Sequence, residues 1–165
     1  MNPIPTDLVF PWVLTRVPVK WDPEDAIGGE EAALQNIPRW TDGLRIAIER
    51  ACFADYLQKI DDIAAEPPTV PVIKSPSQVW SHIELQSVRP FGPDIVVVYA
   101  VPAWDENLHH EWCVEGTDTL LYVGQFLGYS GDGYRSLQHG NAAVSYEETI
   151  ARLGHLPQSW VTDSD

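Results

Sequence analysis

The feature that most restricts the fold is the segment Asp94–Val101, DIVVVYAV, in which seven apolar residues follow an aspartate without interruption. Such a run is typical of a strand that is covered on both faces. On either side of it, Trp80–Val88 and Leu108–Glu115 alternate between apolar and polar residues, as half-buried strands do. Residues 116–118 predict a turn into a fourth strand, Thr119–Leu127. Because the connections are short, the sequence predicts an antiparallel meander of about four strands.

A long helix is predicted from about residue 41 to residue 66. Thr41 is a typical N-cap residue, and Asp42 suits the positive end of the helix dipole. The apolar residues at helical spacing form one stripe of Ile46, Phe53, Leu57, Ile60, Ile63 and Ala64, with Leu44, Ile48 and Ala51 on the opposite face. We therefore expect the first half of the helix to be covered on two sides. Pro67 and Pro68 end the helix.

The flanking segments predict less regular structure. Five prolines confine Leu8–Phe10 and Trp12–Val17 to short extended segments, and a short helix is predicted from Pro23 to Gln35. The Gly-rich segment 128–141 is interpreted as an exposed loop. Ser145, with Glu148 three positions later, predicts the capping box of a helix that ends near Gly154.

These elements predict one domain over residues 1–165. The Pro- and Ser-rich segment 67–78 is interpreted as a loop inside that domain, because it is short and neither flank forms a core of its own. The expected class is α+β: an antiparallel sheet of about four strands within residues 79–127, with a long helix packed on one face. Residues 1–66 supply the helices and residues 128–165 the Gly-rich loop and a final helix.

The charge is strongly negative: 10 Lys and Arg stand against 24 Asp and Glu, for a net charge of −14. A field of this sign repels nucleic acid and anionic membranes and favours basic partners, although solubility alone also explains it. Seven tryptophans add side chains that are frequent both in cores and at interfaces. The N-terminus lacks the basic region of a secretory signal and no run is long enough to span a membrane, so we expect a cytoplasmic protein. Cys52 and Cys113 have no metal-binding spacing.

The densest polar cluster is Trp104–Trp112, WDENLHHEW, which contains five possible metal ligands. If residues 108–115 form a strand, His109 and His110 point to opposite faces, so only one of them can share a site with Glu111. The segment also lacks the H-E-x-x-H pattern of metalloproteases. The Gly-rich segment Gly128–Ser136 has neither a phosphate-loop pattern nor the spacing of a nucleophile elbow. No motif therefore supports a specific reaction.

The segment Val98–Gly124, VYAVPAWDENLHHEWCVEG…LLYVG, joins a strand that ends in Ala-Trp-Asp-Glu to a histidine and a further strand. It resembles an uncharacterised family of small acidic bacterial proteins in which the pattern is closer to W-D-x-E-H-G. Such proteins resemble immunity proteins of bacterial polymorphic-toxin and contact-dependent inhibition systems. The resemblance covers about 27 residues and implies a protein-binding function; it assigns no catalytic residues to this sequence.

We therefore expect an acidic protein-binding inhibitor: an immunity protein that neutralises a basic bacterial toxin by occluding its active site. Its expected contacts are aromatic anchors and a rim of acids in exposed turns and loops: Trp104, Trp112, Tyr129 and Tyr134, with Asp105, Glu106, Glu111 and Asp132. Two alternatives stay open: a small metal-dependent or hydrolytic enzyme that uses the Asp105–Glu111 cluster, and an acidic adaptor or nucleic-acid mimic. No cofactor is expected.

Overall fold

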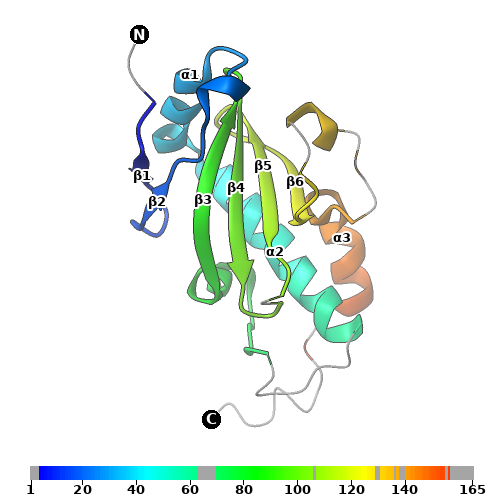
Figure 1. Ribbon diagram of the computed structural model, residues 1–165. Helices are drawn as coiled ribbons and strands as arrows, with labels where there is room; N and C mark the ends of the chain where they lie inside the picture. The colour runs from blue at the N-terminus through cyan, green and yellow to red at the C-terminus, as the bar shows by residue number, and fades with distance from the viewer. Residues whose placement is uncertain are drawn as a thin grey trace.

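The computed structural model describes residues 4–62, 70–105, 107–128, 131–135, 137, 140–154 and 156, with a four-stranded antiparallel sheet at the centre (Figure 1). The strands lie in sequence order: β3 (Ile83–Phe91), β4 (Ile95–Pro102), β5 (His110–Glu115) and β6 (Thr119–Gln125). Helix α2 (Asp42–Asp62) crosses one face, and α3 (Ala142–Leu153) packs against α2 and β6. The predicted α+β class, with its antiparallel sheet and long helix, is confirmed.

The first half of strand β4 is buried on both faces, as its valine run predicts, whereas Tyr99 and Val101 further along are half-buried. Val96 and Val98 belong to the main core, which also contains the buried residues of α2. Val97 belongs to a second apolar cluster on the opposite face, together with Cys113 and Tyr134. The second cover is therefore formed by side chains of neighbouring strands and by the short 3₁₀ helix η4 (Gly131–Tyr134), which carries Tyr134.

Helix α2 begins as predicted and faces the core differently from the prediction. The hydroxyl of Thr41 accepts a hydrogen bond from the backbone N–H of Leu44 at 3.2 Å, as an N-cap should. Leu44 and Ile48 are fully buried, whereas Ile46 is 39% exposed. The expectation that the first half of the helix is covered on two sides is therefore wrong, because only the face of Leu44 and Ile48 meets the core there.

The second half of α2 agrees with the prediction where it can be compared. Phe53, Leu57 and Ile60 are buried in the main core. The predicted stripe residues Ile63 and Ala64, and the predicted end of the helix at Glu66, lie outside the described residues.

The N-terminal segment forms a hairpin beside the sheet (Figure 1). Its strands are β1 (Asp7–Val9) and β2 (Arg16–Pro18), so the predicted strand Trp12–Val17 is wrong over most of its length. Residues 11–13 form the turn instead. After β2, Val19 pairs with Val88 at the edge of β3, and the N–H of Lys20 donates to the Val88 carbonyl at 2.8 Å.

The predicted helix from Pro23 to Gln35 is broken in two. A 3₁₀ turn, η1, covers Pro23–Asp25, and α1 covers Glu30–Asn36 before a second 3₁₀ turn, η2, over Ile37–Arg39. Gly28 and Gly29 separate η1 from α1 with φ angles of +111° and +87°. A right-handed helix requires a negative φ, so no continuous helix can pass through this pair.

The tryptophans of the N-terminal half and the sheet gather in one aromatic cluster. Phe10 contacts Trp12, Trp40 and Trp80 at ring-centroid distances of 5.6–6.2 Å. Trp80 in turn packs edge-on against Trp112 at 5.8 Å. These rings join the hairpin, the segment between α1 and α2, and the sheet, so most of this aromatic content is structural.

Trp80 also explains where β3 begins. Residues Pro76–His82 form a 3₁₀ helix, η3, which brings the Trp80 ring into the aromatic cluster and lets its indole N–H donate to Glu49 at 2.9 Å. The predicted strand Trp80–Val88 therefore starts three residues later, at Ile83, and continues to Phe91. The alternation of apolar and polar residues along the sequence does not reveal that Trp80 contacts Glu49 and the aromatic cluster.

Helix α3 begins at Asn141 and not at the predicted N-cap Ser145, which lies inside the helix. The side-chain carbonyl of Asn141 accepts from the N–H groups of Ala143 at 3.0 Å and Val123 at 3.1 Å. Its amide group donates to the carbonyl of Leu121 at 2.8 Å. Asn141 therefore caps α3 and fixes the helix to β6 at once, which a Ser four residues later could not do.

The remaining composition-based expectations concern the cysteines and the membrane. Both cysteines, Cys52 and Cys113, are buried. Burial raises the pKa of the Cys52 thiol well above its usual value, and the neighbouring charges of Asp55 and Glu49 act in the same direction. Cys52 is therefore a small core residue rather than a nucleophile. Within the ranges described above, no helix is both long and apolar enough to cross a bilayer.

Candidate functional site

The predicted polar cluster at 104–112 lies where the β4–β5 connection meets α2. The indole N–H of Trp104 donates to Oδ2 of Asp55 at 2.9 Å. The same oxygen lies 2.9 Å from Nε2 of His110, the first residue of β5. One turn further along α2, Lys59 forms an ion pair with Asp105 at 3.1 Å. These contacts make Asp55 a bridge between the long helix and the sheet.

The electrostatics of this bridge favour a charged carboxylate. Burial acts to raise the pKa of Asp55, but the charge and hydrogen bond of His110, the hydrogen bond of Trp104 and the charge of Lys59 outweigh it and lower the pKa below its usual value. The other ring nitrogen of His110, Nδ1, is buried without a hydrogen-bond partner in the described part of the chain. A carboxylate that is charged and occupied by two side-chain donors acts as a structural tie between the helix and the sheet.

Glu111 follows His110 and points to the opposite face of the sheet. It is fully buried, and its carboxylate accepts from the N–H groups of Leu127 at 3.2 Å and Gly128 at 3.3 Å and from the hydroxyl of Tyr134. Burial raises the pKa of the nearby Tyr99 phenol, and the charge of Glu111 raises it further. The carboxylate therefore holds the segment after β6 onto the sheet.

This geometry corrects the predicted partner contacts. Four residues that the sequence predicts to be exposed are buried at 0–2% exposure: Trp104, Glu111, Trp112 and Tyr134. Asp105 is half-buried in its ion pair. Glu106, Tyr129 and the side chain of Asp132 lie outside the described residues. The error arises because turn and loop positions indicate exposure only on average, while large aromatic side chains gain most from burial.

The metal-binding alternative can be compared with the described residues only. His110 faces α2 while Glu111 faces the other side, and His109 is exposed just before β5. In the described ranges, no three His, Cys, Asp or Glu side chains come close enough to hold a metal ion. Glu106, which belongs to the predicted cluster, is not among these residues.

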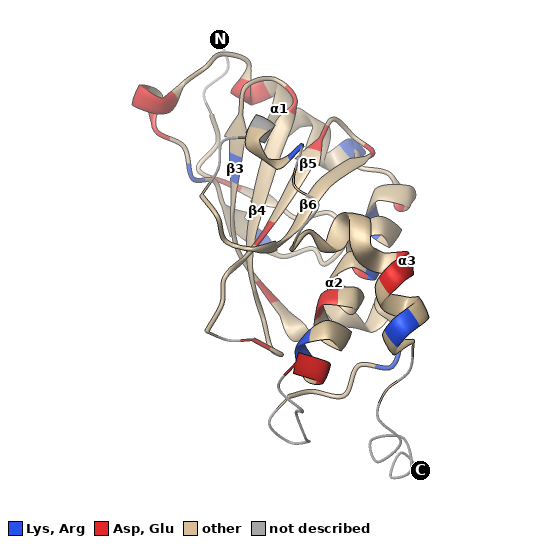
Figure 2. Ribbon diagram, turned by 90° about the vertical axis from the view of Figure 1, so that its right-hand side faces the viewer, with Lys and Arg blue, Asp and Glu red and all other residues tan. Residues whose placement is uncertain are grey.

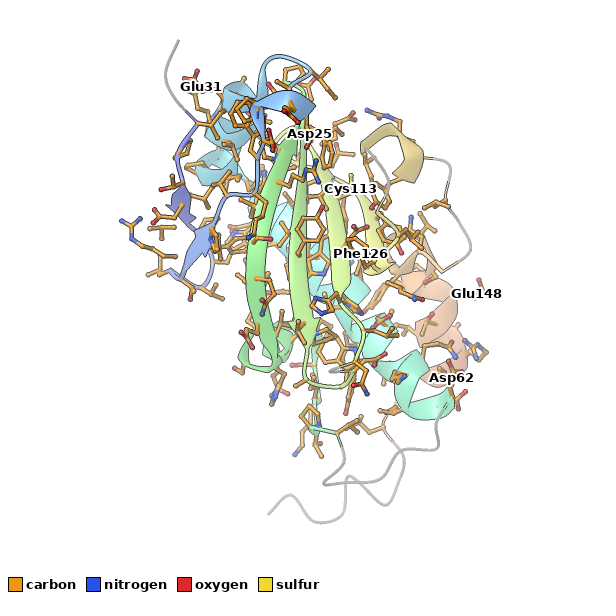
Figure 3. The ribbon with its side chains drawn as sticks, in the orientation of Figure 1. Asp25, Glu31, Asp62, Cys113, Phe126 and Glu148 are labelled. Carbon is orange, nitrogen blue, oxygen red and sulfur yellow. The ribbon has the colours of Figure 1, made fainter. Side chains whose placement is uncertain are left out.

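A surface that the sequence reasoning missed is the segment of residues 22–31, termed the acidic loop. Asp22, Glu24 and Asp25 are exposed in and beside η1, and Ile27 close to them is 71% exposed. Asp25 forms an ion pair with Arg89 of β3 at 3.0 Å. Figure 2 colours acidic residues red at this end of the molecule, and Figure 3 labels Asp25 and Glu31 at the same end.

The acidic loop is held in one conformation by its own backbone contacts. Glu30 turns back and accepts hydrogen bonds from the N–H groups of Ile27 and Gly28. Burial alone would raise the pKa of Glu30, but these backbone donors hold the pKa below its usual value. Gly29 packs so closely on Pro93 of the β3–β4 turn that an added Cβ would lie 2.7 Å from the proline Cβ. The density of acids around an Ile-Gly-Gly sequence is the signal that could have identified this loop.

A second surface feature is a groove on the face of the sheet opposite α2, with a volume of about 720 Å³. The side chains of Ser87 and Tyr99 line it, with Lys20 on one side and Leu108, His109 and Phe126 on the other. Figure 3 shows Phe126 over the open face of the sheet. Leu108 and His109 belong to the predicted polar cluster, so part of that cluster does reach the surface, by way of the groove.

Together these features define an acidic α+β protein with two surfaces suited to binding, a rigid loop and a groove. The chain belongs to the family DUF6985, a domain of unknown function, whose family model matches residues 11–130. The match includes the acidic loop, α2 and the whole four-stranded sheet, and α3 follows it. No curated protein and no solved structure matches the chain.

Proposed function

We propose that this chain is an immunity protein, which neutralises a basic toxin domain in the cytoplasm by binding over its active site, and that the acidic loop is its main contact surface. The observation that carries the proposal is a loop that exposes the acids Asp22, Glu24 and Asp25 and, close by in the sequence, the apolar Ile27, with the turn at residues 27–30 held by backbone hydrogen bonds to Glu30. The resemblance of residues 98–124 to immunity proteins is consistent with it.

Charge supports the choice of a basic partner. The net charge of −14 produces a field that attracts cationic domains over distances of about a Debye length, roughly 8 Å at physiological salt. Steering of this kind raises the association rate, which an inhibitor of a toxin needs because free toxin acts at once. Glu24 is exposed and available to meet a lysine or arginine of the partner.

Rigidity and an apolar centre support a tight complex. A loop that is fixed before binding loses little conformational entropy when it docks. Ile27 offers apolar surface at the middle of the acids, which is the position that interface anchors occupy. These two properties take the place of Trp104, Trp112 and Tyr134, the predicted aromatic anchors that the structure buries.

The two alternatives are not supported by a particular observation. The enzyme alternative needs accessible side chains in the Asp105–Glu111 cluster, and Glu111 is buried with its oxygens occupied. A nucleic-acid mimic would bind a basic protein through the same carboxylates, so the identity of the captured partner decides between mimic and immunity protein.

The test begins with capture of binding proteins from the native host by the full chain, followed by identification with mass spectrometry. The purified partner is then measured by surface plasmon resonance at several salt concentrations, and co-expression shows whether the chain restores growth. Glu24→Gln should slow association severalfold at low salt and have little effect at high salt. Ile27→Ala should speed dissociation about tenfold, which corresponds to about 1.4 kcal/mol.

The control variants are Glu147→Gln and Val144→Ala, which make matching changes at exposed positions of α3. Association that does not depend on salt would refute steering by the acidic loop. Equal effects of the α3 variants and the loop variants would refute the assignment of the surface. A partner that binds nucleic acid and is not toxic would replace immunity by mimicry.

A further inference from the structure

The groove on the open face of the sheet has the size and shape of a small-molecule site. Its volume of about 720 Å³ falls within the range of roughly 300–1,000 Å³ that is usual for ligand pockets. Its floor is formed by Ser87 and Tyr99, which are directly paired across strands β3 and β4. It shares no lining residue with the acidic loop, which contacts β3 at Arg89.

The aromatic and apolar part of the lining is fixed in place. The rings of Tyr99 and Phe126 lie 6.0 Å apart at an angle of 45°. The N–H of Phe126 donates to the carbonyl of His109 at 2.8 Å, so the two segments that form this wall are joined. Glu111 holds the next residue, Leu127, from beneath. Phe126 itself is 51% exposed, which leaves its ring available to a ligand.

The charge of the lining is opposite to that of the protein. Among the described residues that line the groove, the side chains that are cationic when charged are Lys20 and His109, and no carboxylate is present. No carboxylate of the described chain forms an ion pair with Lys20. Two acids in the neighbouring strands are engaged elsewhere: Glu111 accepts hydrogen bonds from the segment after β6, and Glu84, which is not part of the lining, accepts from Gln86 at 2.9 Å.

Polar groups also converge on the floor of the groove. Ser87 is only 5% exposed and lines the groove, and its hydroxyl makes no hydrogen bond to any residue within the described ranges. Gln86 uses its amide N–H on Glu84, which leaves its carbonyl oxygen free to accept. A few such groups within an apolar lining are what fixes the orientation of a bound ligand.

We propose that this groove binds a small molecule with an aromatic body and an anionic group. The aromatic body lies against Tyr99 and Phe126, and the anionic group meets the ammonium of Lys20. The charge complementarity selects an anion in a protein that otherwise repels anions, and the site therefore differs in chemistry from the acidic loop. The proposal stands whether or not the chain binds a toxin.

The test uses two fluorescent probes with the same aromatic body: 1-anilinonaphthalene-8-sulfonate, which is an anion, and N-phenyl-1-naphthylamine, which is neutral. The anionic probe should bind the full chain saturably, with one molecule per chain by isothermal titration calorimetry. Phe126→Ala should weaken both probes about tenfold, because both lose the aromatic wall. Lys20→Gln should weaken the anionic probe about fivefold and leave the neutral probe within about twofold.

The matched controls are Val144→Ala and Lys74→Gln, which remove an exposed apolar group and an exposed lysine away from the groove. All four substitutions are at exposed positions, and unchanged melting temperatures will show that the probes do not report unfolding. Non-saturable binding, or binding that Phe126→Ala leaves unchanged, overturns the site. A Lys20→Gln variant that weakens both probes equally, or neither, overturns the preference for an anion.

Discussion

The bridge that Asp55 forms between α2 and β5 can be tested by the substitution Asp55→Asn, which keeps the size of the side chain and removes its charge. In the native protein one carboxylate oxygen meets both the indole of Trp104 and the imidazole of His110, each at 2.9 Å. The asparagine amide presents an uncharged oxygen and a nitrogen that cannot accept. Both partners therefore lose a charged acceptor, and if the amide nitrogen takes the place of Oδ2 they lose the acceptor altogether.

The expected loss of stability follows from the burial of the partners. The His110 side chain is 4% exposed and the Asp55 side chain 29% exposed, so water replaces the lost contacts only in part. A hydrogen bond to a charged group contributes about 1.5–3 kcal/mol, and breaking a buried pair costs about 3–5 kcal/mol. Because Asp55 retains some contact with solvent, we expect a loss of about 2–4 kcal/mol at neutral pH.

The lowered pKa of Asp55 also predicts how the loss of stability in Asp55→Asn changes with pH. The pKa of Asp55 in the folded chain is lowered, and in the unfolded chain it is near the ordinary value of about 3.9. A lowered folded pKa means that the stabilisation is fully present above the unfolded pKa and is lost as the pH falls through the folded pKa. The difference between the native chain and Asp55→Asn should therefore shrink below about pH 4, as Asp55 becomes protonated.

The assay is urea unfolding followed by tryptophan fluorescence and circular dichroism at pH 7, 5, 4 and 3. The control is Asp61→Asn, which removes the same charge from an exposed position on the same helix and should change stability by less than about 0.5 kcal/mol. If Asp55→Asn costs no more stability than the control at pH 7, or if its cost does not shrink between pH 4 and pH 3, the charge of Asp55 does not stabilise the contact between α2 and β5.

Four further substitutions test the packing. Leu57→Ala should lower the free energy of unfolding by about 2–5 kcal/mol, because the Leu57 side chain is 1% exposed. Ile46→Ala should lower it by less than about 1 kcal/mol, because Ile46 is 39% exposed. Equal denaturation midpoints for the two variants would show that the side of α2 that faces the core is assigned wrongly. Tyr134→Phe should lower the free energy of unfolding by about 1–3 kcal/mol, because the buried carboxylate of Glu111 loses a hydrogen-bond donor. Amide hydrogen exchange at residues 127 and 128 should then become faster. Unchanged exchange rates would contradict the view that Glu111 holds this segment on the sheet. Gly29→Ala should cost about 1–3 kcal/mol through its positive φ and the contact with the β3–β4 turn, and a neutral thermal melt would reject that close approach.

The sequence predicted the elements whose signal is local or continuous. The valine run of β4 identifies a doubly covered strand because a strand with one face in water alternates between apolar and polar residues instead. Thr41 identifies the start of α2 because the capping hydrogen bond involves residues three positions apart. Ser145 has the same local pattern, but Asn141 forms the cap because it also satisfies two groups of β6, 18 and 20 residues away along the chain.

The candidate surfaces could be predicted only in part, because exposure is a tertiary property. Nothing near Trp112 or Tyr134 in the sequence indicates that the first packs on Trp80 and the second on Tyr122. Exposure of Ile27 likewise depends on the turn made by the two glycines that follow it, which the prediction of a continuous helix places inside that helix. The amount of charge and its density along residues 22–31 can be read from the sequence, whereas the hydrogen bonds that fix the turn of this loop cannot.

The contacts of Asn141 and Lys20 have a consequence for how the sheet can be recognised. Partners of many β-proteins attach by adding a strand to an open edge, and the same open edges lead to aggregation. Here the carbonyl of Leu121 and the N–H of Val123 on one edge are bonded to Asn141, and the carbonyl of Val88 on the other is bonded to Lys20. Both edges are thus interrupted near their middle by the chain's own groups, which discourages growth of the sheet into fibres and leaves faces and loops as the surfaces open to recognition.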